Sequence, residues 1–180
     1  TISDITISAG STTGTASFTP TDDSVYEGDE TGIVSISGVS GGSATESGTQ
    51  SVTITINENE STPTVTLTTS ATSIDENSGS VLTLTATLSN ATTADVTVSI
   101  ATSGTATEGT DYTDGSGNID DIVISAGNTT ETISFRPTDD SVYEGDETAT
   151  ISISGVSGGS ATESGTQEVS ITISENESAP

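Results

Sequence analysis

Apolar residues alternate with Thr or Ser along most of this chain. A period of two places one face of a strand inward and leaves the hydroxyl-bearing face outward. Clusters of Gly, Ser, Asn and Asp separate the segments and mark turns. The pattern predicts an all-β fold, a seven-stranded Greek-key β-sandwich made of two sheets. The predicted strands are Val65–Leu67, Leu82–Leu88, Val96–Ile100, Ile122–Ile124, Ile133–Phe135, Ala149–Ile153 and Val169–Ile173.

The chain also repeats itself at an offset of 117 residues. Residues 1–63 align with residues 118–180, with 49 identities in 63 pairs. Such similarity is typical of recent duplication in a tandem array, and a unit of about 117 residues has the length of one β-sandwich domain. We therefore predict two domains. Residues 1–61 are the C-terminal half of one repeat, and residues 62–180 form a complete repeat.

Composition narrows the classes of function. The formal net charge is −26, and Arg136 is the one basic residue. Binding to nucleic acid or to an anionic membrane needs basic groups, so neither is expected, and no apolar run is long enough for direct membrane insertion. Hydrophobic residues make up 28% of the chain and Cys is absent, so the core is thin and has no disulfide staple. Bound metal is the usual substitute in an extracellular domain.

One acidic run of twelve residues occurs twice, at Pro20–Thr31 and at Pro137–Thr148, with the same sequence. Each copy places five carboxylates within nine residues, and these charges repel one another unless a cation lies among them. Oxygen donors alone suit a hard cation, calcium above all. The run therefore predicts a calcium-binding loop. The alternative is an acidic loop that stays solvated, as in a salt-adapted protein.

The segment Gly104-Thr-Ala-Thr-Glu-Gly-Thr-Asp-Tyr112 resembles the Gly-Thr-Ala-x-x-Gly-x-Asp-Tyr signature of Calx-beta domains. Further segments that resemble Calx-beta motifs lie around the signature in the order typical of the family: Asp75–Gly79, Ser125–Gly127, Asp139–Glu147 and Ile171–Glu177. The resemblance covers residues 62–177. It implies an immunoglobulin-like sandwich whose loops at one end hold clustered calcium ions.

Carried over by position, the resemblance also implies a set of calcium ligands. In the complete repeat these are Glu76, Asp111, Asp139, Asp140, Glu144, Glu147, Glu175, Asn176 and Glu177, where Asn176 replaces a carboxylate. In the half-repeat they are Asp22, Asp23, Glu27, Glu30, Glu58, Asn59 and Glu60, with no counterpart of Glu76 or Asp111. Tyr112 and Tyr143 are expected to wall off the site or fill the core. We interpret six other acidic residues as solvated charge: Asp75, Asp120, Asp121, Glu131, Glu163 and Glu168.

The absence of His, Cys and Lys removes most base, nucleophile and electrophile chemistry, so the chain is not expected to be an enzyme. We expect a calcium-stiffened stalk repeat of a large, secreted adhesin at the cell surface. Its partners are calcium ions and neighbouring repeats of the same chain. Two alternatives stay open: a regulatory calcium-sensor domain, and a filament subunit in which another chain completes residues 1–61.

Overall fold

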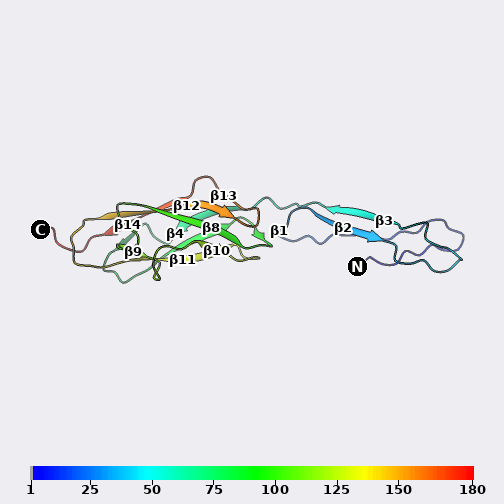
Figure 1. Ribbon diagram of the computed structural model, residues 1–180, viewed down its shortest axis with the longest axis horizontal. Coiled ribbons are helices and arrows are strands. Elements are labelled where there is room, and N and C mark those ends of the chain that lie inside the picture. The colour runs from blue at the N-terminus through cyan, green and yellow to red at the C-terminus, as the bar shows by residue number, and fades with distance from the viewer. Residues whose placement is uncertain (1) are drawn as a thin grey trace. The chain divides into compact units, whose positions relative to one another are not determined.

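The computed structural model describes residues 2–180, and the described residues form strands and turns without a helix (Figure 1). Thr1, the first residue of the predicted half-repeat, lies outside them. The described residues contain no helix that could cross a membrane. The chain forms two compact units, the first comprising residues 2–23 and 29–57, the second Ser24–Gly28 and Glu58–Pro180. The boundary at residue 61 stays a prediction.

Two five-stranded sheets build the second unit (Figure 1). Most neighbouring strands are antiparallel, while β14 (Glu168–Ser174) with β5 (Ser73–Asp75) and β13 (Thr162–Glu163) with β4 (Thr64–Thr69) are parallel. The first sheet is ordered β10 (Ile122–Ile124), β8 (Val96–Gly104), β12 (Glu147–Ser157), β14 (Glu168–Ser174), β5 (Ser73–Asp75). The second is ordered β13 (Thr162–Glu163), β4 (Thr64–Thr69), β6 (Leu82–Leu88), β11 (Thr130–Pro137), β9 (Tyr112–Thr113).

All seven predicted segments lie in strands of this unit, so the predicted all-β sandwich is confirmed. The strand count differs, because the described residues add the short strands β5, β7 (Ala91–Thr92), β9 and β13. A fifth short strand, β1 (Val25–Tyr26), pairs in parallel with β7 and belongs to the second unit. Four of these strands have only two residues, which cannot show a period of two, and β5 has a single apolar residue, Ile74.

The apolar side chains of the alternating segments fill the space between the two sheets. Aliphatic residues dominate this core, among them Val65, Leu84, Val98, Ile122, Ile151 and Ile171. Tyr112 is 1% exposed and stacks on Phe135, with ring centroids 4.8 Å apart and an interplanar angle of 21°. Two aromatic rings thus anchor a core otherwise made of aliphatic side chains. Both lie near the end of the sandwich where β9 meets β11.

The first unit contains an antiparallel hairpin, β2 (Glu30–Ser35) with β3 (Ser51–Ile56). Its apolar residues are not buried as their repeat counterparts are. Ile5, Ile7 and Phe18 are 56%, 57% and 42% exposed, whereas Ile122, Ile124 and Phe135 are 0% exposed. In the complete repeat β8 pairs with β10 and β6 pairs with β11. Residues 2–61 contain no counterpart of β6 or β8, so these side chains lack their cover.

Candidate metal centre

The glycine that opens the Gly104–Tyr112 signature makes a close backbone approach possible. Gly104 has φ +124°, and a Cβ added there would lie 2.0 Å from the carbonyl oxygen of Thr148. The backbone N–H groups of Thr105 and Ala106 donate to that same oxygen at 2.9 and 3.1 Å. No side chain fits in this space, which explains why the signature begins with glycine.

The same turn fixes the orientation of Asp111. Its Oδ2 accepts a hydrogen bond from the backbone N–H of Thr107 at 2.5 Å, and its carbonyl accepts one from Thr138 N–H at 2.9 Å. Asp111 is only 9% exposed, an unusual position for a carboxylate. The signature thus buries one charged group at the end of the sandwich, where β9 and β11 meet the acidic loop.

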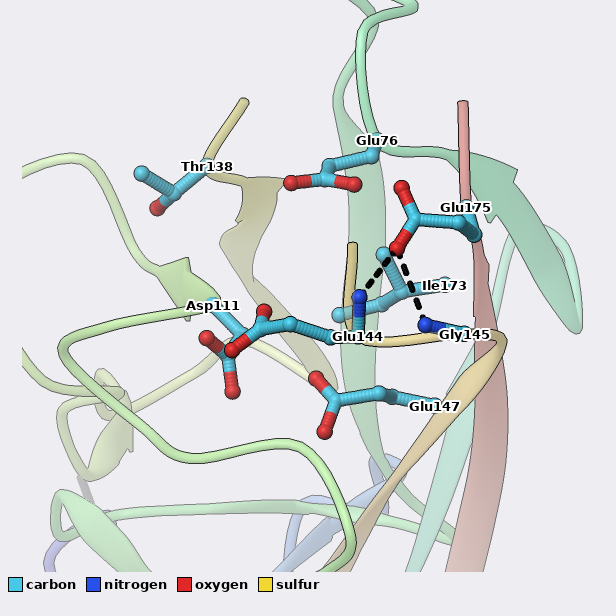
Figure 2. A pocket seen from close by; sticks show the side chains of 8 residues that line it. All are labelled: Glu76, Asp111, Thr138, Glu144, Gly145, Glu147, Ile173 and Glu175. Atoms are coloured by element: carbon cyan, nitrogen blue, oxygen red, sulfur yellow. Dashed lines mark hydrogen bonds between the residues drawn. The ribbon is translucent and has the colours of Figure 1, made fainter. Parts of the chain in front are cut away.

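Glu175, just past β14, holds the acidic loop through its backbone. One oxygen, Oε2, accepts hydrogen bonds from the N–H groups of Glu144 and Gly145 at 2.6 and 2.9 Å (Figure 2). The other, Oε1, accepts from Asn176 and Glu177 at 2.9 Å each. These N–H donors lower the pKa of Glu175 to about 2, because they stabilise its charged form. Glu175 therefore fixes the acidic loop by these hydrogen bonds, an arrangement that we call the staple, and its carboxylate stays ionised at neutral pH.

Carboxylates from four chain segments converge beside this staple. Figure 2 shows Glu76, Asp111, Glu144, Glu147 and Glu175 around one pocket, which Thr138, Gly145 and Ile173 also line. Two groups of three have ligand oxygens within 4.8 Å of one another: Glu76 with Glu175 and Glu177, and Asp111 with Glu144 and Glu147. Arg136 is not among the lining residues. Negative charge is therefore concentrated here without a basic side chain in the lining.

Three other predicted ligands of the complete repeat lie close by but outside these groups. Asp140 donates its backbone N–H to Glu76 Oε1 at 3.3 Å, while its own Oδ1 accepts from Val142 N–H at 2.7 Å. The charges of Asp140 and Asp139 help to raise the pKa of Glu76, after burial, which is the larger cause. Asn176 is exposed and donates from Nδ2 to Glu177 Oε1 at 3.2 Å. Direct coordination by these three residues stays a prediction.

The electrostatics of the pocket favour a bound cation. Burial, and then the neighbouring Asp111, raise the pKa of Glu147 to about 7. The charge of Asp111, followed by burial, raises the pKa of Glu144. Glu177 Oε2 is buried and has no hydrogen-bond donor among the described residues. A cation would relieve the repulsion and satisfy the buried oxygen. The all-oxygen donor set fits Ca²⁺ in particular.

The half-repeat contains the same staple. Glu58 Oε2 accepts from Glu27 and Gly28 N–H at 2.5 and 2.7 Å, and its Oε1 accepts from Asn59 and Glu60 at 2.9 and 3.0 Å. These bonds lower the pKa of Glu58 to about 2. Within the described residues, both three-carboxylate groups belong to the complete repeat. The ligand roles of the half-repeat residues, Asp22, Asp23 and Glu30 included, stay predictions.

Several side chains have roles that differ from those inferred from the sequence. Asp146, for which the sequence pattern indicates no role, accepts the backbone N–H of Glu175 at 3.0 Å and so supports the staple. Asp121 accepts from Ile100 N–H at 2.9 Å, and Glu163 accepts from Gln167 N–H, so both organise local backbone instead of being merely solvated. Tyr112 fills the core as expected, whereas Tyr143 is 46% exposed and is not part of the core. Its role in walling off the site stays a prediction.

Comparison with known proteins agrees with this fold. The model of the Calx-beta domain family matches residues 3–60 and 58–177. A crystal structure of the apo form of the Calx CBD1 domain shares the fold at 20% identity with a TM-score of 0.51, covering 63% of this chain and 99% of that one. A second match, CBD12 from CALX1.2, has 21% identity and a TM-score of 0.47, covering 57% of this chain and 40% of its own length. No curated protein matches.

Proposed function

Because this chain belongs to the Calx-beta domain family, we propose that it is a calcium-binding structural repeat of a large extracellular adhesin, in which calcium stiffens domains and junctions. Calx-beta domains bind Ca²⁺ and have regulatory or structural roles. One observation carries the proposal: carboxylates from four chain segments converge on one pocket, and no basic side chain lines it. Such an arrangement is costly unless a cation is bound.

The side chains divide into two candidate ligand groups. Asp111, Glu144 and Glu147 would hold one ion, and Glu76, Glu175 and Glu177 would hold another. Calcium takes about 6–8 oxygen ligands, so backbone carbonyls and water complete each shell. When bound, the ion supplies positive charge that links loops distant in sequence. At tenfold excess over Kd, each independent site would add roughly 1.4 kcal/mol to the free energy of unfolding. The free energy added by several such sites would be a substantial part of the stability of a domain with so thin a core.

The stalk role is supported by the repeat and by the segment that leads into the complete repeat. Near-identical tandem copies suit a spacer better than a sensor, which gains nothing from duplication. Pro63 is fully buried, and its carbonyl accepts from Thr162 N–H at 3.1 Å. Asn90 Nδ2 donates to the carbonyl of Ser61 at 2.7 Å. The segment that enters the repeat is thus fixed on it by hydrogen bonds and burial.

We also propose an extracellular, cell-surface location, and the expected calcium affinity supports it. Extracellular modules commonly bind calcium with Kd values of about 10⁻⁴–10⁻³ M, so their sites fill outside the cell and empty in the cytosol. The chain has no Cys, so a metal would have to supply the stabilisation that disulfides give other secreted domains.

A calcium titration of the 180-residue chain, followed by thermal unfolding, tests the proposal. Calcium should raise the melting temperature of the complete repeat strongly. Magnesium should raise it much less, because Mg²⁺ demands a tighter octahedral shell and dehydrates reluctantly. A melting curve that stays unchanged after chelation would refute the hypothesis that bound calcium stabilises the fold.

A second candidate function is supported by the exposed apolar side chains of the first unit. Ile5, Ile7 and Phe18 occupy positions that are fully buried in the complete repeat. Strands of another chain, equivalent to β6 and β8, would cover them and give an assembling filament subunit. Light scattering separates the two functions. A monomer at all concentrations favours the stalk, and polymers whose size grows with concentration favour the subunit.

A further inference from the structure

The Val-Tyr dipeptide at the centre of the acidic run occurs in two environments. Val25–Tyr26 forms β1, which pairs in parallel with β7 in the register Val25↔Ala91 and Tyr26↔Thr92, and both residues are half-buried. Val142–Tyr143 belongs to no strand, and its side chains are 57% and 46% exposed. The twelve residues of the run are identical in both copies. The sequence of the run therefore does not explain why only Val25–Tyr26 is a strand. The two copies differ in that β7 pairs with the first.

The loop has the same local conformation in both copies. Glu58 accepts from Glu27 and Gly28 N–H just as Glu175 accepts from Glu144 and Gly145 N–H. The glycine of each copy has the same backbone angle, φ +80° at Gly28 and φ +81° at Gly145. The dipeptide is thus presented in the same way whether or not a partner strand is present. Such preorganisation lowers the entropic cost of docking.

The acceptor strand β7 is itself fixed. Thr92 is 2% exposed, its Oγ1 donates to Ala94 O at 2.6 Å, and its carbonyl accepts from Gly127 N–H at 2.8 Å. A Cβ at Gly159 would lie 2.7 Å from Thr92 Oγ1, so the backbone of that turn packs directly on Thr92. In Figure 1, β1 lies at the end of the second unit opposite β9, β14 and the C-terminus. One repeat therefore carries the acidic loop at one end and the acceptor strand at the other.

We propose that Val142–Tyr143 is a docking strand for β7 of a second copy of the repeat. The occupant is a following repeat, whose Ala91 and Thr92 would pair with Val142 and Tyr143 as they pair with β1 here. Donor and acceptor lie at opposite ends, so the contact is head-to-tail and generates an open array instead of a closed dimer. The inference goes beyond calcium binding, although it rests on the proposed role as a tandem repeat.

Hydrogen exchange on the 180-residue chain and on an extended chain tests the proposal. The extended chain carries a second copy of residues 64–180 after Pro180, which is equivalent to Pro63. In the 180-residue chain, the amides of Val25 and Tyr26 should exchange at least about tenfold more slowly than those of Val142 and Tyr143, because only the former have a partner strand. In the extended chain the amides of Val142 and Tyr143 should become equally protected. Equal rates in the first chain, or unchanged rates after extension, would overturn the proposal.

Matched substitutions give a second readout. Replacing Val25 and Tyr26 with Ser should speed exchange at β7, whereas the same change at Val142 and Tyr143 should leave the 180-residue chain unaffected. In the extended chain the second change should abolish the new protection, and failure to do so would overturn the proposal. Calcium titration of the same samples keeps the two hypotheses apart. Protection of Val25 and Tyr26 without calcium binding would refute the calcium role alone, and calcium binding with equal exchange rates would refute docking alone.

Discussion

At the scale of single residues, two carboxylates that line the same pocket have different protonation behaviour. Glu175 accepts four backbone N–H groups, and its pKa falls to about 2. Glu147 is partly buried beside Asp111, and its pKa rises to about 7. The first carboxylate positions the loop, while the second stays poorly satisfied until a cation arrives. Local donors and burial, more than the number of charges, therefore decide which residues respond to calcium.

The substitution Glu147→Gln should separate repulsion from coordination. Without calcium it should raise the melting temperature at pH 8, because it removes a charge that burial and Asp111 disfavour. It should also weaken calcium binding by roughly tenfold, since an amide oxygen replaces a carboxylate ligand. Calorimetric titration and thermal unfolding measure the two effects. Asp120→Asn is the matched control, because Asp120 is exposed and lies outside both carboxylate groups. Equal effects of the two substitutions would mean that bulk charge attracts the ion.

The calcium-free chain should become less stable as pH rises from 5 to 8. Glu147 keeps its proton up to a pKa of about 7 in the fold, but loses it near pH 4.5 when unfolded. The folded state then binds more protons across this window, so the free energy of unfolding falls with pH. Glu175, with its pKa lowered to about 2, contributes stability that is lost only in stronger acid. Saturating calcium should remove the decline. Thermal unfolding in chelator and in calcium at each pH checks this, and a flat chelator series would contradict it.

At the scale of elements, the Gly104 turn controls where Asp111 lies. Gly104→Ala should lower the free energy of unfolding by about 1–3 kcal/mol, because φ is +124° and the new Cβ would meet Thr148 O. Calcium affinity should fall with it, since Thr148 follows Glu147 and the turn orients Asp111. Gly117→Ala is the control, because a Cβ there meets nothing within 4 Å. Urea unfolding and calcium titration of both variants measure the difference. A Gly104 variant as stable as the control would show that the turn tolerates a side chain.

The sequence could predict the elements whose signal is local. The seven alternating segments are strands, and the Gly104–Tyr112 signature is equally local, because Thr107, four residues away, donates its N–H to Asp111. The two-residue strands β7 and β9 escaped prediction, because only partners distant in sequence create them. The same reason explains Asp146, whose partner is Glu175. It also explains Phe18, which is exposed although its identical counterpart Phe135 is buried.

At the scale of the whole molecule, the net charge of −26 acts against any compact arrangement of repeats. Calcium can act in two ways. As a screening ion it would relax a self-repelling chain and let it contract. As a ligand at the loop ends it would order the acidic loops, each of which presents a docking dipeptide to the next repeat. These two actions predict opposite changes in the length of an array, so length discriminates between them.

X-ray scattering on an array of three or four complete repeats measures that length. We expect millimolar calcium to lengthen and stiffen the array, and chelator to leave flexibly linked domains or a coil. Sodium chloride at matched ionic strength is the control, because it screens charge without coordinating the loops, and it should not reproduce the stiffening. Repeats that stay folded and equally extended in chelator would show that buried Pro63 and the pairing of Val-Tyr with β7 stiffen the junction without help from the ion. Calcium would then stabilise single domains only, and the junction role proposed for it would be wrong.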